Sequence, residues 1–65
     1  MRFTLEIHCD GAAFCDDDGD PAPEQELVRI LRALACDIMR TRRAPHHNIH
    51  DVNLNRVGDA RLIEE

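Results

Sequence analysis

The stretch LVRILRALACDI, residues Leu27–Ile38, carries the clearest structural signal in this chain of 65 residues. Apolar side chains recur in it at steps of three and four residues, which is the spacing of an amphipathic α-helix. We therefore predict a helix over residues 24–41. The apolar stripe that would face a core consists of Leu27, Ile30, Leu31, Leu34, Ala35 and Ile38.

The residues on either side of this stretch mark the ends of the helix. Pro21 and Pro23 suit a first helical turn, where a missing N–H is harmless, and Asp20 is a candidate cap. Pro45 ends the helix, because the residue before a proline avoids helical backbone angles.

Alternating patterns before and after the helix predict strands. In residues 2–8, Phe3, Leu5 and Ile7 share one face, which is typical of a half-buried strand. Two further strands are predicted at residues 48–52 and 56–63.

The connection between these last two strands has its own features. Asn53-Leu54-Asn55 contains two residues that tolerate left-handed backbone geometry. Gly58 interrupts the strand that follows and is a candidate β-bulge, with Ala60 and Leu62 then facing the helix.

Together these elements predict a single small domain over residues 1–65 of the α+β class. One helix packs on a three-stranded, largely antiparallel sheet in the order β-α-β-β, and we expect the first strand to lie beside the last. A domain of this size buries only about 60% of its unfolded surface. Its function is therefore expected on the surface, and a monomer is expected because the single apolar stripe serves the sheet.

Composition narrows the class of function. The net charge is −5, the eight basic residues are all Arg, and Phe3 and Phe14 are the only aromatic residues. Nucleic-acid binding needs basic charge and stacking rings, so direct binding to nucleic acid is not expected. No apolar run approaches the roughly 20 residues of a membrane span. The three cysteines, Cys9, Cys15 and Cys36, suit reduced thiols in a cytoplasm.

Negative charge is concentrated before the helix. Residues 9–23 are a predicted loop with Phe14 as its anchor, and the segment CDDDGDPAPE, Cys15–Glu24, holds four aspartates within five residues. Residues 1–26 contain eight acids against Arg2 alone. Calcium-loop spacing fails here, because neither glycine nor glutamate falls at the required position. A solvated loop that favours the helix N-terminus is one interpretation of this charge.

Zinc is a second candidate ligand. Cys9, Cys15, His46, His47 and His50 are suitable ligand types, yet no C-x2-C pair is present and the histidines do not share a helical face. A structural zinc mini-domain remains an alternative on these residues.

Catalysis has little support in the sequence. Cys36 lies beside the apolar stripe, and we predict that it packs there rather than acting as a nucleophile. Glu6, Asp10 and His8 carry no sign of the desolvation that acid–base catalysis uses. A phosphate-binding glycine loop and a nucleophile elbow are also missing. We expect a protein that is not an enzyme and that carries no cofactor.

Charge mimicry is the functional interpretation of the acidic loop. Extended chain advances about 3.3 Å per residue, and a DNA strand places a phosphate about every 3.4 Å. An extended Asp16-Asp17-Asp18 run would present carboxylates at a similar spacing. Such a surface would attract a protein whose DNA channel is lined with Arg and Lys.

A resemblance strengthens this interpretation. The chain resembles very small phage and mobile-element proteins with an acidic D-[GN]-A-A-F loop, one amphipathic helix and a D-x-N-x-N-x-V-G hairpin. The matching segments are Asp10–Phe14, Leu27–Ile38 and Asp51–Gly58. A glycine is usual where Leu54 stands, so the turn is expected to differ. Within this group the sequence is similar to anti-CRISPR proteins, in particular inhibitors of type I-C systems.

The resemblance implies inhibition without catalysis in the cytoplasm of the bacterial host. It implies binding to the positively charged DNA-binding or PAM-reading surface of the large subunit of the Cascade surveillance complex. The expected contact residues are Asp10, Asp16, Asp17, Asp18, Asp20, Glu24 and Glu26. The other alternative is a phage-encoded regulator that binds its partner through the helix face of Arg29, Arg32 and Arg40.

Overall fold

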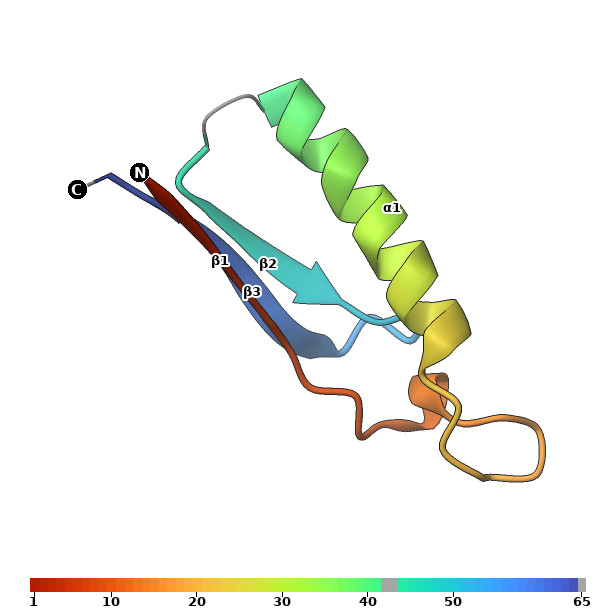
Figure 1. Ribbon diagram of the computed structural model, residues 1–65. Helices are drawn as coiled ribbons and strands as arrows, with labels where there is room; N and C mark the ends of the chain where they lie inside the picture. Colours follow the sequence, from red (N-terminus) through yellow and green to blue (C-terminus); the bar gives the residue numbers. More distant parts are fainter. Residues whose placement is uncertain (42–43, 65) are drawn as a thin grey trace.

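The computed structural model describes residues 1–41 and 44–64. Along the chain it contains β1 (Arg2–Ile7), a short 3-10 turn η1 (Ala12–Phe14), α1 (Glu24–Thr41), β2 (His46–His50) and β3 (Arg56–Ile63) (Figure 1). The sheet order is β1-β3-β2, and both strand pairs are antiparallel. The predicted α+β class, the β-α-β-β order and the pairing of the first strand with the last are confirmed.

The helix has its predicted bounds but a different cap. It begins at Glu24, directly after Pro23, whose carbonyl oxygen accepts the N–H of Leu27 at 2.9 Å. Asp20 lies four residues before Glu24, and its N–H donates to Asp16 Oδ1. The prediction that Asp20 caps α1 is therefore wrong. Glu24, Glu26 and, at the other end, Arg40 match the charges that the helix dipole favours.

The predicted bounds of β2 are shifted by two residues. The sequence indicated residues 48–52, whereas the strand spans His46–His50. Asp51 N–H donates to the Asn55 carbonyl within the turn, and Val52 N–H donates to the side chain of Glu26. Both backbone groups are thereby withdrawn from the strand ladder, which ends β2 at His50.

The core lies between the first half of α1, η1 and the middle of the sheet. Its buried residues are Phe14, Ile30, Leu34, Ile49 and Ala60. Phe14 is 1% exposed, which confirms it as the anchor of the loop before α1.

The helix covers less of the sheet than the sequence indicated. α1 packs against η1 and β2, and Leu31, which the stripe assigned to the core, is 45% exposed. Ala35 is exposed as well. Since α1 lies over the β2 side, the flank of the helix that carries these two residues has less sheet beneath it.

Gly58 is required by a close approach of β1. A Cβ atom at this position would overlap the carbonyl oxygen of Glu6 and lie 3.0 Å from Ile7 Cα. The β-bulge lies beside it: the register passes from Ile49 opposite Gly58 to His50 opposite Arg56, which leaves Val57 as the extra residue. The bulge predicted at Gly58 is thus displaced by one residue. Ala60 faces the core as predicted.

The molecule is elongated, with principal extents of 44 × 21 × 17 Å. The segment between η1 and α1 forms one end, while both termini lie at the opposite end (Figure 1). Across the described part of the chain, α1 included, no helix combines the length and apolar character needed to cross a bilayer.

Candidate functional site

The loop before α1 folds into a small hairpin at one end of the molecule. We call residues 15–21 the acidic hairpin. Its base is a bridge between Cys15 and Pro21, and the N–H of Asp16 donates to the carbonyl of Asp20 at 2.9 Å. At its tip, Gly19 has a positive φ of 83°, a backbone angle that glycine adopts without strain. Buried Phe14 directly precedes the hairpin and holds it to the core.

Asp16 shapes this hairpin from within. Its Oδ1 accepts the backbone N–H groups of Asp18 and Asp20, each at 2.9 Å. An aspartate that binds backbone groups a few residues ahead stabilises a turn. Asp17 and Asp18 consequently lie in a turn rather than in extended chain. The expected row of carboxylates at phosphate spacing is wrong, because the backbone folds back on itself there.

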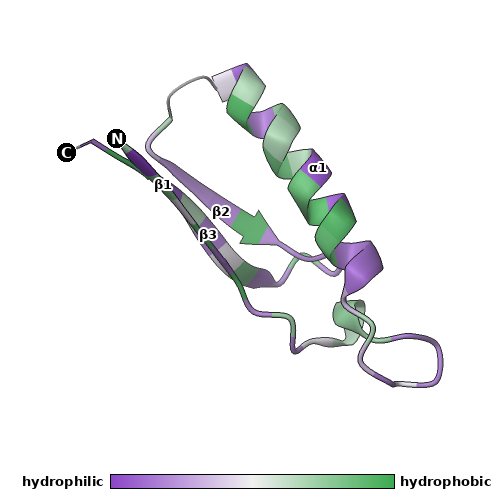
Figure 2. Ribbon diagram, viewed as in Figure 1, coloured by the Kyte–Doolittle hydropathy of each residue, from purple (hydrophilic) through white to green (hydrophobic). Residues whose placement is uncertain are grey.

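The other acids at this end are exposed, and no cation of the described residues lies beside them. They are Asp10, Asp17, Asp18, Asp20 and Glu24. Within residues 1–41 and 44–64, none of their side chains forms a hydrogen bond or an ion pair. Figure 2 shows the hairpin as a mostly hydrophilic projection beyond the N-terminal end of α1, whose first turn is hydrophilic as well.

Two acids elsewhere on the surface, Asp37 and Asp59, differ in this respect, whereas exposed Glu64 near the C-terminus has no ion pair within the described residues either. Asp37 Oδ1 lies 3.0 Å from Arg40 Nη2, and Asp59 Oδ2 lies 2.8 Å from Arg61 Nε. Asp59 also accepts from His46 at 3.2 Å, and the Arg61 hydrogen bond is the main cause that lowers the pKa of Asp59. Most of the negative charge that has no counter-charge among the described residues therefore lies at one end of the molecule. We call this surface the acidic end and define it as Asp10, Asp17, Asp18, Asp20 and Glu24.

Glu26 is separated from this surface, although the sequence grouped it there. Its side chain is 7% exposed and binds Arg29 through both oxygens, at 2.7 Å to Nε and 3.0 Å to Nη2. Its Oε2 also accepts the backbone N–H of Val52 at 2.7 Å. The Arg29 hydrogen bond lowers the pKa of Glu26, against the opposing effect of burial. This carboxylate joins α1 to the turn after β2.

Asp51 is a second buried carboxylate, and no site prediction included it. It is 3% exposed. Its Oδ1 accepts the N–H groups of Asn53 and Asn55 at 2.9 Å each, and Asn55 Nδ2 donates to Oδ2 at 3.3 Å. The D-x-N-x-N spacing was the signal for this role, since it places an acid at the start of a turn and the side-chain amide of Asn55 four residues after it.

The candidate zinc ligands are not brought together. Among the residues that the structure describes, no three His, Cys, Asp or Glu side chains are placed to hold a metal ion. His46 pairs with Asp59, while the thiols of Cys9 and Cys15 lie near the backbone carbonyls of Ile7 and Gly11. Cys36 is exposed, so the prediction that it packs beside the stripe is wrong.

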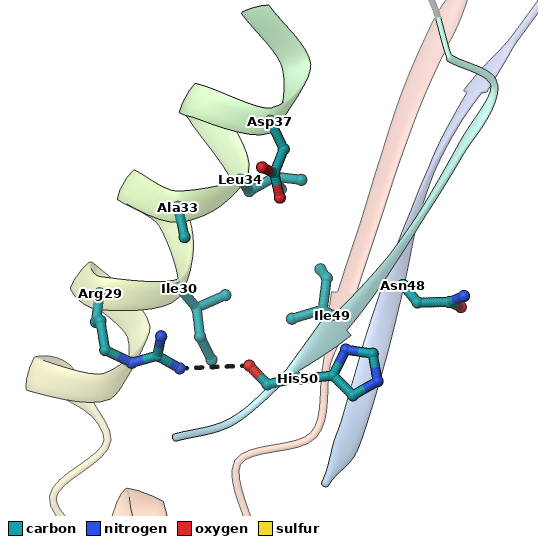
Figure 3. A pocket seen from close by; sticks show the side chains of 8 residues that line it. All are labelled: Arg29, Ile30, Ala33, Leu34, Asp37, Asn48, Ile49 and His50. Carbon is teal, nitrogen blue, oxygen red and sulfur yellow. Dashed lines mark hydrogen bonds between the residues drawn. The ribbon is translucent and has the colours of Figure 1, made fainter. Parts of the chain in front are cut away.

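A shallow cleft lies between α1 and β2. It has a volume of about 180 Å³ and is lined by Arg29, Ile30, Ala33, Leu34, Asp37, Asn48, Ile49 and His50 (Figure 3). Arg29 reaches across it to the carbonyl oxygen of His50 at 3.3 Å. Small-molecule sites usually enclose about 300–1,000 Å³. The cleft is thus smaller than an ordinary ligand site.

No protein-family model matches this chain, and no curated protein and no solved structure matches it either. The resemblance to anti-CRISPR proteins therefore stays a prediction from the sequence motifs.

Proposed function

We propose that this protein is an anti-CRISPR inhibitor that binds the type I Cascade surveillance complex through its acidic end. In this proposal the protein acts in the cytoplasm of the bacterial host and without catalysis. It occupies the positively charged surface of the large Cascade subunit and blocks recognition of the PAM. Blocking that step is effective because PAM contact precedes guide–target pairing in RNA-guided systems.

One observation carries the proposal: the five carboxylates of the acidic end have no cation beside them within the described residues. Carboxylates at close quarters repel one another, so an uncompensated group lowers stability unless a partner supplies positive charge. A surface lined with Arg and Lys would supply it and would form charge-assisted hydrogen bonds. The long-range field would also speed the encounter.

The hairpin adds preorganisation. Asp16 and the Cys15–Pro21 bridge hold the tip in one shape, and Phe14 fixes its base. Asp17, Asp18 and Asp20 are thus presented on an ordered loop, which reduces the entropy cost of binding. The hairpin does not reproduce a straight row of phosphates. In this proposal it therefore imitates the negative charge of DNA, concentrated at a projecting tip, and not the phosphate spacing.

The helix-face regulator has less support. Two of its three arginines are engaged within α1, because Arg29 binds Glu26 and Arg40 binds Asp37. These pairs leave little unpaired positive charge along that face for an acidic partner.

A gel-shift of target duplex on purified type I-C Cascade tests the proposal. We expect the wild-type protein to abolish the shift. The variant D17N/D18N/D20N should need at least about tenfold more protein for the same effect, since it loses three charge-assisted contacts. Asp16 is kept in this variant because its side chain builds the hairpin.

The matched control is D37N/D59N/E64Q, which removes the same charge away from the acidic end. It should inhibit like the wild type. Arg32→Glu should also inhibit normally. If the protein instead acted as a regulator through its helix face, this variant would lose its function. If wild-type protein leaves DNA binding unchanged, or if both triple variants lose activity equally, the proposal is wrong.

A further inference from the structure

β1 forms an unprotected edge of the sheet. It pairs with β3 from Arg2 to Ile7 without a register shift, and no strand of the described chain lies on its other side. The opposite edge, β2, is shorter and is interrupted between Ile49 and His50. Proteins usually protect strand edges with bulges, prolines, short length or charged side chains. β1 has no bulge and no proline, and its two charged residues, Arg2 and Glu6, have opposite signs, so a second copy of the same strand can pair with it.

The hydrogen-bonding groups on this edge can be assigned from the register. His8 N–H donates to the Val57 carbonyl at 2.7 Å, so the backbone of His8 faces β3. Backbone groups of alternate residues point to opposite sides of an antiparallel strand. The N–H and C=O groups of Phe3, Leu5 and Ile7 therefore point toward the free edge.

The face of β1 that points toward the helix layer is apolar and incompletely covered. Leu5 is opposite Ala60 in the register, so the two residues share a face. Ala60 is fully buried, yet Leu5 is 40% and Phe3 is 46% exposed. The difference follows from the position of α1, which packs on β2 and leaves the β1 side open. An apolar strip thus runs along the free edge.

We propose that two copies of this chain pair through the free edges of β1, antiparallel and about a two-fold axis at Thr4. Phe3 then lies opposite Leu5 of the partner subunit, and their backbone groups are those that face the free edge. On the other face, Arg2 lies opposite Glu6 of the partner subunit. Each contact occurs twice, as a two-fold interface requires.

Charge and packing select this register. Opposite charges and apolar pairs placed directly across a seam stabilise antiparallel strands. An axis at Leu5 would also use the outward backbone groups, but it would place Arg2 opposite His8 of the partner subunit and Glu6 opposite the partner's Thr4. The axis at Thr4 therefore places residues of opposite charge, Arg2 and Glu6, across the seam at two points. Glu6 lies 3.1 Å from His8 on its own strand, on the same face as the proposed contact.

The dimer contains one continuous six-stranded sheet. Its formation is independent of the proposed binding to Cascade. Because the paired β1 strands run in opposite directions, the two acidic ends point away from each other. None of the five residues of the acidic end lies in the seam. Loss of the dimer and loss of Cascade inhibition are thus separable results. A monomer was expected from the sequence because one stripe would serve the sheet, but α1 leaves Phe3 and Leu5 exposed.

Analytical ultracentrifugation over a dilution series tests this proposal. Concentrated wild-type protein should have twice the 7.4 kDa mass of one chain. Glu6→Arg places like charges opposite each other at two points, so the dimer dissociation constant should rise by about tenfold or more. The exchanged variant R2E/E6R restores both pairs and should dimerise like the wild type.

Leu5→Pro provides a second test, since it removes an N–H that faces the free edge and not one that binds β3. This variant should be monomeric and should keep the far-UV circular dichroism spectrum of the wild type. The same spectrum, measured for the charge variants, serves as their folding control. A wild-type protein that stays monomeric at every concentration overturns the proposal. Equal dimerisation of Glu6→Arg and R2E/E6R overturns the Thr4 register.

Discussion

Glu26 Oε2 accepts the backbone N–H of Val52 at 2.7 Å, across a separation of 26 residues in sequence. This contact joins the first turn of α1 to the turn that follows β2. The same carboxylate binds Arg29, which in turn donates to the His50 carbonyl. A single acidic side chain therefore fixes how the helix begins relative to the end of β2.

Replacing this carboxylate should reduce stability. Hydrogen bonds to a charged group contribute about 1.5–3 kcal/mol each in favourable cases, so Glu26→Gln should lower the free energy of unfolding by about 2 kcal/mol. The matched control is Glu24→Gln, which is exposed and should change it by less than about 0.5 kcal/mol. Urea denaturation of the three proteins measures both values. Equal stability of the two variants would show that the Glu26 contacts contribute nothing.

Glu26 also predicts a pH dependence. Its pKa in the folded protein is lowered from an ordinary value of 4.5, chiefly by Arg29. A lowered folded pKa contributes stability that is complete above the unfolded pKa and is lost as the pH falls through the folded pKa. The stability difference between wild type and Glu26→Gln should thus be constant near neutrality and shrink in acid. Urea midpoints across a pH series measure it. A difference that grows on acidification contradicts the assignment.

Leu54 offers a stabilising substitution. It has a φ of 67°, a left-handed angle that is unfavourable for a side chain with a Cβ, and it is 82% exposed. Leu54→Gly removes this strain and should raise the free energy of unfolding by about 0.5–1 kcal/mol, which corresponds to a melting temperature roughly 2–6 °C higher. The control is Val52→Gly in the same turn, where φ is not positive and the melting temperature should fall. Thermal denaturation distinguishes the two outcomes.

Gly58 should tolerate no side chain. The backbone of β1 occupies the position of its Cβ, so Gly58→Ala must displace β1 from β3. We expect a loss of about 3 kcal/mol or more, a large part of the stability of a domain this small. Gly11→Ala is the control, since apart from its chain neighbours the nearest atom to the added Cβ would be Asp51 Oδ2 at 3.8 Å, an ordinary contact distance. If both alanine variants have the same melting temperature, β1 does not approach Gly58 as closely as described.

Most of the fold follows from local patterns. The three- and four-residue periodicity of α1 and the alternation of β1 identified both elements with nearly their observed bounds. The end of β2 was misplaced because it depends on a side chain from α1. Val52 has a strand-like sequence context, but its N–H is bound by Glu26 rather than by β3.

The acidic surface follows from the sequence in outline only. The aspartates before α1 were expected to be exposed, and Asp17, Asp18 and Asp20 are. Asp16 could not be distinguished from them, because its inward role depends on how the hairpin closes. Glu26 differs from Glu24 by two positions along a helix, and that rotation turns it toward the core side.

The order of the elements, the class of fold and the concentration of charge before the helix can be predicted from the sequence alone, since periodicity, prolines and acid counts are local properties. Tertiary structure decided which carboxylates remain for a partner and which bind within the chain. It also decided that α1 covers β2 and leaves Phe3 and Leu5 exposed on β1. Those outcomes depend on contacts between residues far apart in sequence, which no local pattern encodes.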